Sequence, residues 1–175
     1  MMASYILRER LNDKNIEAIV EDANIKEILN SNSWSYSSSY KASRFLIKDT
    51  IKKYPNIKLF IDLHRDSVSH KVSTTSSNGK KYAKVMFVIG KEYDSYKKNL
   101  EVANKLNNII KNKASISRGV LLKEGKNVNG VYNQDINPNI ILIECGGNEN
   151  SLEEVINTID LLAEAISIYL GDSNG

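Results

Sequence analysis

The sequence predicts a single-domain α/β fold in three layers, with a mixed, mostly parallel sheet flanked by helices. Two observations carry this prediction. Short apolar runs of strand length alternate along the chain with longer segments of helical periodicity. The apolar runs are nearly continuous instead of alternating with polar residues, which is typical of strands covered on both faces. No internal repeat or domain boundary interrupts the 175 residues, a length that suits one domain.

The first third of the chain is expected to hold two helices. Apolar residues at helical spacing predict a helix over residues 5–14. Residues 16–20 mix charged and apolar side chains in the manner of an edge strand, and the Ser- and Asn-rich residues 30–39 predict a loop. The second helix is expected over residues 41–54, because Pro55 cannot continue it.

The middle of the chain is expected to supply two buried strands and a helix. The apolar run at residues 57–63 predicts a strand that ends in charged residues. Asn78 and Gly79 form a dipeptide typical of a hairpin turn. A second buried strand is expected over residues 85–89, and a helix over residues 94–113.

The last third of the chain is expected to end in a long helix. A short strand is predicted at residues 119–122, followed by a polar loop over residues 123–138 and a nearly continuous apolar strand over residues 139–145. Ser151 and Glu154 have the spacing of a capping box, which predicts a helix start at this point.

Composition excludes several classes of protein. Hydrophobic residues make up 41% and charged residues 26%, a globular balance that argues against disorder. A single Cys rules out an internal disulfide or a Cys-rich zinc module. No apolar run approaches the ~18–20 residues of a membrane span. The net charge of +3 suits an anionic polymer as partner, but Lys and Glu interleave, so we expect no nucleic-acid binding.

The amino terminus lacks the charged and apolar regions of a secretion signal. The sequence is therefore expected to come from a cytoplasmic protein or to be a piece of a longer exported one.

Two strand ends carry the ionisable residues that suggest chemistry. In open α/β sheets, ligands bind beyond the carboxyl ends of the strands. His64 follows the apolar strand and shares a face with Asp62, so it is a candidate metal ligand, although a lone His is more often a structural residue. The dense group of ionisable residues around it favours a functional role, since burying polar groups is costly.

Glu144 lies inside the other apolar strand, where burial would raise its pKa toward the range of a general acid or base. An ion pair with Arg118 or Arg65 is an equally good interpretation. Cys145 points to the opposite face and is expected to be a small core residue. The Gly146-Gly147 pair predicts a tight turn, without the spacing of a phosphate-binding loop.

The remaining polar residues are open to plain interpretations. His70 is expected to be a solvated loop residue. Arg118 and the loop at residues 129–135 either hold substrate or are ordinary solvated segments. Three aromatic residues, Trp34, Tyr36 and Tyr40, either stack on sugars or, as is more common in a Ser-rich loop, pack against the protein.

Five blocks occur together in one order, and they cover essentially the whole chain. The blocks are FIDLHRDS (60–67), VMFVIG (85–90), SRG (117–119), GVYNQD (130–135) and ECGGNEN (144–150). With these blocks, the chain resembles the stage II sporulation protein P (SpoIIP) family of zinc-dependent N-acetylmuramoyl-L-alanine amidases. The resemblance implies a mixed α/β amidase fold.

The resemblance also implies an activity and a set of site residues. The substrate would be the amide between N-acetylmuramic acid and L-alanine in peptidoglycan, and members are also described as cutting peptide crosslinks. His64 would be a ligand of a Zn²⁺ cofactor and Glu144 the catalytic glutamate. Within the matched blocks, substrate binding is expected from a further set of polar residues: Arg65, Asp66, Arg118, Asn133 and Gln134.

Family members act during engulfment outside the cytoplasm, anchored on the membrane, with the partner SpoIID. They carry an earlier strand that ends in a His and is soon followed by a Glu, both zinc ligands. By this resemblance, the chain is expected to begin at the following helix, and residues 1–4 are expected to be a tag or a start remnant. We therefore expect the other ligands upstream, a sheet without its first strand, and weak or absent zinc binding by this chain, which is either truncated or a divergent inactive copy.

Two rival functions remain open. The first is a non-catalytic peptidoglycan-binding or complex-forming domain of the same fold. The second is a cytoplasmic hydrolase on a flavodoxin-like sheet that uses Asp62, His64 and Glu144.

Overall fold

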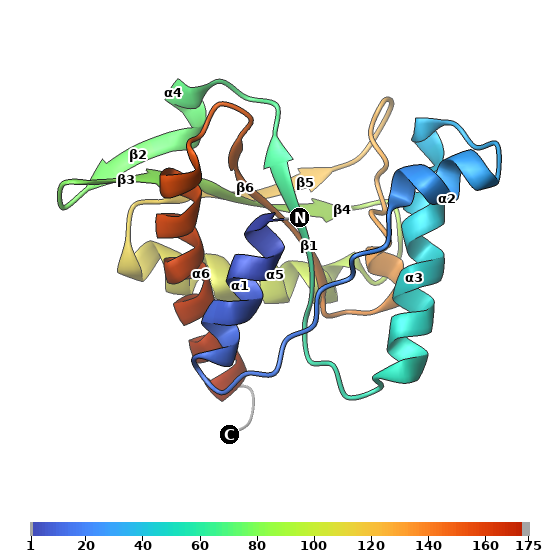
Figure 1. The fold of residues 1–175 in the computed structure, drawn as a ribbon, viewed down its shortest axis with the longest axis horizontal. Helices are drawn as coiled ribbons and strands as arrows, with labels where there is room; N and C mark the ends of the chain where they lie inside the picture. The colour runs from blue at the N-terminus through green and yellow to red at the C-terminus, as the bar shows by residue number, and fades with distance from the viewer. Residues whose placement is uncertain (1, 173–175) are drawn as a thin grey trace.

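The computed structural model describes residues 2–172 and confirms the α/β class (Figure 1). In chain order the elements are α1 (Met2–Asn12), α2 (Ile25–Ser31), the 3₁₀ turn η1 (Tyr36–Ser38), α3 (Ser39–Lys53), β1 (Phe60–Asp66), α4 (His70–Ser73), β2 (Thr74–Ser77), β3 (Lys80–Ala83), β4 (Val85–Gly90), α5 (Tyr96–Lys113), β5 (Ser117–Lys123), the 3₁₀ turn η2 (Gln134–Ile136), β6 (Ile140–Gly147) and α6 (Leu152–Asp172). No helix within residues 2–172 is long and apolar enough to cross a membrane.

The central sheet has four strands in the order β1-β6-β4-β5. β1 pairs with β6 in parallel, β4 pairs with β5 in parallel, and β4 runs antiparallel to β6. The sheet is therefore mixed and mostly parallel, as predicted. The carboxyl ends of β1 and β6 lie at the same end of the sheet as the amino ends of β4 and β5. Ionisable groups from both strand pairs can therefore gather there.

The main hydrophobic core lies on one face of the sheet, under α1, α5 and α6. Phe87, Ile141, Ile143 and Cys145 point into it and are fully buried. Burial of each large apolar side chain contributes about 1.5–3 kcal/mol. The odd-numbered residues of β6 fill this core, so Glu144 belongs to the other face. Figure 1 shows α3 standing on the far side of β1 from α1 and α6.

The segment before α3 differs from the sequence prediction. Residues 16–20 form no strand, and Ile19 is 50% exposed. The expected edge strand is wrong, because residues 16–20 pair with none of the described strands. Helix α2 was not expected; it begins after Asn24, whose side-chain oxygen accepts from the backbone N–H groups of Lys26 and Glu27. The spacing of Asn24 and Glu27 is a helix-capping signal that could have located this helix.

The segment that connects β1 to β4 in the sequence forms a separate two-stranded sheet, β2–β3. Its turn is the predicted Asn78-Gly79 pair, with φ values of 50° and 76°, as a two-residue hairpin turn requires. Thr158 of α6 donates to the carbonyl of Ala83 at 2.7 Å and fixes the base of this hairpin. The hairpin is therefore packed onto the helix that follows β6.

Candidate active site

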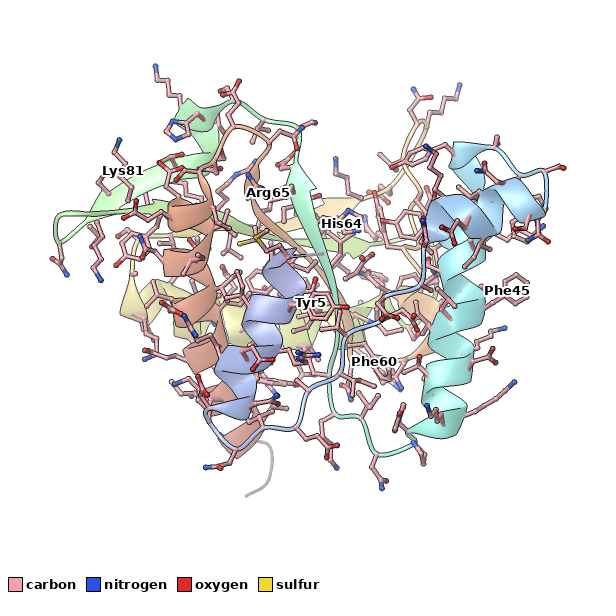
Figure 2. The ribbon with its side chains drawn as sticks, in the orientation of Figure 1. Tyr5, Phe45, Phe60, His64, Arg65 and Lys81 are labelled. Carbon is pink, nitrogen blue, oxygen red and sulfur yellow. The ribbon has the colours of Figure 1, made fainter. Side chains whose placement is uncertain are left out.

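His64 and Glu144 lie side by side on the two adjacent parallel strands. They are direct register partners of β1 and β6, so both side chains leave the sheet on the same face. Neighbouring strands are about 4.8 Å apart, which fixes the spacing of the two backbones. β1 extends to Asp66 and not only to residue 63, so His64 is held within the strand. Figure 2 shows His64 and Arg65 on opposite sides of β1.

Asp62 orients the His64 ring. His64 Nε2 lies 2.8 Å from Asp62 Oδ1, two residues earlier on the same face of β1. This hydrogen bond to the carboxylate raises the pKa of His64. In the neutral ring the bond places the proton on Nε2, because a carboxylate only accepts. Nδ1 then carries the lone pair.

Glu144 is a partly buried carboxyl group with one unsatisfied oxygen. Its Oε2 is buried and has no hydrogen-bond partner among the described residues. Burial raises the pKa of Glu144, the nearby His64 charge opposes this, and the carboxylates of Asp66 and Asp62 add to the increase. A buried polar atom without a partner calls for an explanation such as a ligand or a catalytic role. Glu144 therefore has the environment of a general acid or base.

The ion-pair interpretation of Glu144 does not hold for the described residues. Arg118 pairs instead with Asp66, at 2.7 Å between Nη1 and Oδ2, with both side chains about five-sixths buried. The two residues come from β5 and β1, the outermost strands of the sheet. This ion pair therefore reaches across the sheet, at the end where Glu144 lies.

Two irregularities in the sheet lie next to these residues. The β1–β6 register shifts after His64, so that Asp66 faces Gly147, and Gly146 takes a φ of 72°. The β4–β5 register shifts beside Arg118, where Gly119 takes a φ of 94°. Bulges of this kind are common at active sites, where they redirect side chains.

Arg65 lies away from this group. Its guanidinium donates to the backbone carbonyl of Gly147 from Nε at 3.0 Å, and Nη2 donates to the carbonyl of Asn150 at 2.9 Å. Arg65 therefore fixes the turn between β6 and α6.

Asn133 and Gln134 are engaged in packing of the loop between β5 and β6. Gln134 is 1% exposed, and its side chain accepts from the Gly90 N–H and donates to the Val88 carbonyl, both at 2.9 Å. Asn133 donates to the backbone carbonyl of Tyr40 at 2.9 Å. The pair attaches the loop to β4 and α3, and the structure brings neither side chain into the group around Glu144.

Cys145 is a core residue, as predicted. It is fully buried, and burial raises the pKa of its thiol to about 12. A thiol that stays protonated at neutral pH is a poor nucleophile.

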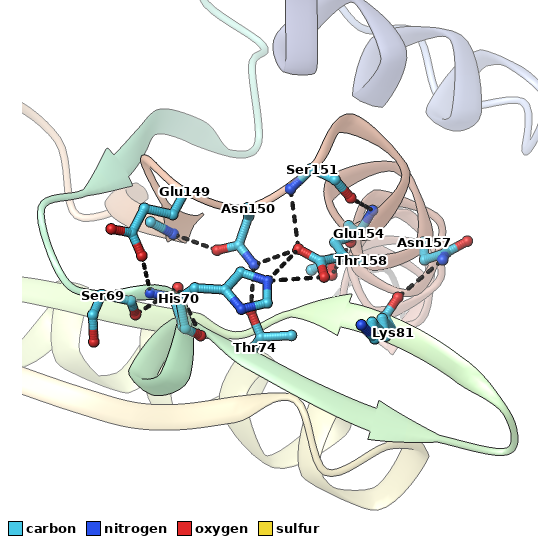
Figure 3. A network of polar contacts seen from close by, with 12 residues as sticks. Ser69, His70, Thr74, Lys81, Glu149, Asn150, Ser151, Glu154, Asn157 and Thr158 are labelled. Atoms are coloured by element: carbon cyan, nitrogen blue, oxygen red, sulfur yellow. Dashed lines mark hydrogen bonds and ion pairs between the residues drawn. The ribbon is translucent and has the colours of Figure 1, made fainter.

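The expectation that His70 lies in a loop is wrong, although its side chain is 42% exposed. His70 begins α4, and its Nε2 lies 3.0 Å from Glu154 Oε1, in a network that also contains Asn150 and Thr74 (Figure 3). The partners are 84 residues apart, so no local pattern could reveal the contact. The capping box of Ser151 and Glu154 is confirmed, with N–H to side-chain distances of 3.0 and 3.2 Å.

The described residues do not fit a zinc ion by themselves. Within residues 2–172 no three His, Cys, Asp or Glu side chains come together in a group that could hold a metal. Catalytic zinc normally has three protein ligands, and this site offers one imidazole that is already bonded to Asp62.

The fold is that of an amidase of known structure. It matches the structure of the CwlD amidase from Clostridioides difficile in complex with the GerS lipoprotein, with a TM-score of 0.57 and 15% identity, over 97% of this chain and 81% of the other. The sequence profile of the family "Stage II sporulation protein P (SpoIIP)" matches residues 1–167, and the chain belongs to this family. Stage II sporulation protein P of Bacillus subtilis (strain 168) is 36% identical over 166 residues, which are 94% of this chain. The chain spans 41% of the length of that relative.

Proposed function

We propose that this chain is part of a sporulation peptidoglycan hydrolase that cleaves the amide between N-acetylmuramic acid and L-alanine. The observation that carries the proposal is the buried, unpartnered oxygen of Glu144 in direct register with His64. Membership of the SpoIIP family and the amidase fold support the same activity.

Amide hydrolysis needs a proton acceptor and a proton donor in turn. Glu144 takes a proton from the attacking water as the new C–O bond forms. It then delivers the proton to the nitrogen of L-alanine as the C–N bond breaks. A carboxyl group whose pKa is raised by burial is a better proton acceptor than an exposed carboxylate, and it can return the proton that it has taken. The Arg118–Asp66 ion pair lies beside this group, and its Asp66 carboxylate affects the pKa of Glu144 more than its Arg118 guanidinium does.

A zinc ion, when bound, would supply Lewis-acid polarisation of the amide carbonyl and a more acidic water. We propose that zinc binds at His64 only with further ligands from outside the described residues, because no three-ligand group exists among them. The two proton transfers assigned to Glu144 use only its own carboxyl group.

A second candidate function is a non-catalytic domain of the same fold that binds peptidoglycan or joins a complex. The missing three-ligand group within residues 2–172 favours it. It differs from the first candidate in predicting binding of peptidoglycan without release of stem peptide.

We also propose the setting in which the protein works. The CwlD structure contains the GerS lipoprotein, and a protein partner is proposed here as well, with SpoIID as the family's expected one. The whole protein is proposed to be extracytoplasmic and membrane-anchored, where its peptidoglycan substrate is found.

The test uses purified peptidoglycan and a version of the protein as long as the B. subtilis relative. Released stem peptides are quantified by mass spectrometry for the parent and for Glu144→Gln, with and without a chelator. We expect release by the parent and a loss of about 100-fold or more in the variant, the usual scale for a general acid–base group. Equal release by Glu144→Gln would defeat the mechanism, and binding without any release would favour the second candidate.

A further inference from the structure

The loop between β5 and β6 holds a tyrosine in an unusual backbone conformation. Tyr132 has a φ of 52° and Asn133 follows with a φ of 56°. Asn tolerates this left-handed region, but a bulky residue such as Tyr is an outlier there. Such strain persists only where the surroundings enforce it, and it concentrates at functional sites.

The residues around Tyr132 enforce its conformation from both sides. Upstream, the side-chain oxygen of Asn129 accepts from the N–H groups of Val131 and Tyr132. Downstream, Asn133 and Gln134 hold the loop to α3 and β4 through one partly buried and one buried hydrogen bond. A network of this size around one partly exposed side chain indicates that its position matters, since functional side chains need a rigid supporting shell.

The Tyr132 ring meets a second tyrosine from another element. Its centroid lies 5.4 Å from that of Tyr40 on α3, at an interplanar angle of 82°. Both rings are half-buried. Burial is the main cause of the raised pKa of each phenol, and the charge of Glu144 adds to both, so the pair lies within electrostatic range of the candidate site.

We propose that Tyr132, supported by Tyr40, is a substrate-positioning residue that forms an aromatic wall beside Glu144 and holds the sugar end of the peptidoglycan amide. The proposal rests on the function proposed above and adds a binding residue to it. Tyrosine suits the role because it offers a large, rigid contact surface with few rotatable bonds. The apolar face of a sugar ring can pack on such a surface, while the phenol donates a hydrogen bond at its edge.

Burial raises the pKa of both phenols, so both remain protonated donors at neutral pH.

A purely structural role for Tyr132 would give a different pattern of ligand affinities among variants. If the Tyr132 ring existed only to fill space, an asparagine at this position would leave ligand binding unchanged.

The experiment measures binding of a fluorescent disaccharide–peptide, prepared from purified peptidoglycan, in a Glu144→Gln background that prevents turnover. The variants are Tyr132→Asn, which suits the positive φ but lacks the ring, and Tyr132→Phe, which keeps the ring. Tyr54→Asn is the matched control, because Tyr54 is a partly exposed tyrosine at the other end of α3. Tyr40→Leu removes the supporting ring in a helix-compatible way and serves if Tyr132→Asn does not fold.

We expect Kd to rise about tenfold in Tyr132→Asn and about fivefold in Tyr40→Leu, and to stay within about threefold of the parent in Tyr132→Phe and Tyr54→Asn. An unchanged Kd in the folded Tyr132→Asn or Tyr40→Leu protein would overturn the proposal, and so would an equal loss in Tyr54→Asn. A Tyr132→Phe protein as weak as Tyr132→Asn would overturn the assignment to the ring. If the parent protein binds no disaccharide–peptide, the proposed function fails as well. If the parent binds it and the Tyr132→Asn and Tyr40→Leu variants bind it equally well, only the present proposal fails.

Discussion

His70 and Glu154 join two segments of the chain that lie 84 residues apart. His70 Nε2 lies 3.0 and 3.1 Å from the two carboxyl oxygens of Glu154, and the Glu154 side chain is 7% exposed. The same carboxylate accepts from Asn150 Nδ2 at 2.8 Å and from the Ser151 N–H at 3.0 Å (Figure 3). This carboxylate therefore caps α6 and attaches the segment that leads into the β2–β3 hairpin.

Acid should destabilise the protein partly through Glu154. Burial alone would raise the pKa of Glu154, but the hydrogen bonds from Asn150, His70 and the Ser151 backbone outweigh it, so the pKa is lower than usual. Because the folded-state pKa is lower than the unfolded one, the stabilisation is present above the ordinary pKa and is lost as the pH falls through the folded value.

We therefore expect Glu154→Gln to lower the free energy of unfolding at pH 7 by about 1–3 kcal/mol and to weaken its dependence on pH below about 5. Urea unfolding between pH 3 and 7 measures both effects. Glu153→Gln, an exposed neighbour in the same helical turn, is the control. Identical acid sensitivity of the two variants would contradict this account.

Removal of the Glu144 charge should cost no stability. Burial raises the pKa of Glu144 above its unfolded value, so its ionisation at neutral pH opposes folding, and the cost grows as the pH rises from the unfolded pKa to the folded one. Glu144→Gln is expected to keep or raise Tm at pH 7, while the difference from the parent shrinks below about pH 4. Calorimetry at pH 4 and pH 7 checks this. A large fall in Tm at pH 7 would show that the carboxylate is structural.

The two bulge glycines should differ in their tolerance of alanine. A Cβ on Gly146 would lie 2.7 Å from Asn150 Oδ1 and 2.8 Å from the Cβ of Ala83, whereas one on Gly119 would meet nothing within 4 Å. Both have positive φ, which costs about 1–2 kcal/mol for a residue with a Cβ. We expect about that loss for Gly119→Ala, and about 1–3 kcal/mol more for Gly146→Ala because of the overlap. Urea unfolding compares them, and equal losses would contradict the assignment.

Zinc content should depend on residues outside those described. We expect the 175-residue chain to retain little zinc after dialysis, because one imidazole does not satisfy the usual three-ligand requirement. A version as long as the B. subtilis relative should bind about one zinc per molecule, and His64→Ala should lose it. Metal analysis by mass spectrometry, with His70→Ala as control, measures this. Stoichiometric zinc in the short chain would refute the expectation.

The sequence was sufficient where local pattern and tertiary packing agree. The apolar run at residues 139–145 became the central strand β6, and the Ser151–Glu154 spacing marked the start of α6. Residues 16–20 had the composition of a strand, but composition does not supply a pairing partner, and none of the described strands pairs with them.

The site was predicted in part for similar reasons. His64 and Glu144 could be placed on strand ends because burial and alternation are local properties. Three features depend on segments that are far apart in the chain, and local pattern could not reveal them. They are the antiparallel pairing of β4 with β6, the Arg118–Asp66 ion pair and the His70–Glu154 contact. The loop amides of Asn133 and Gln134 were predicted to bind substrate, but they bond to backbone and side-chain groups of α3 and β4, which lie far away in the sequence.

The two register shifts make the end of the sheet around Glu144 sensitive to the insertion or deletion of a single residue in β5 or β6. β6 has one extra residue relative to β1, and β5 has one extra residue relative to β4. These extra residues determine that Gly147 pairs with Asp66 and that Val120 pairs with Phe87. Deleting either residue would change the angle at which the backbone leaves the sheet, even if every ionisable side chain were kept. Homologous proteins with a one-residue gap at Gly119 or Gly146 should therefore present these ionisable groups in a different arrangement.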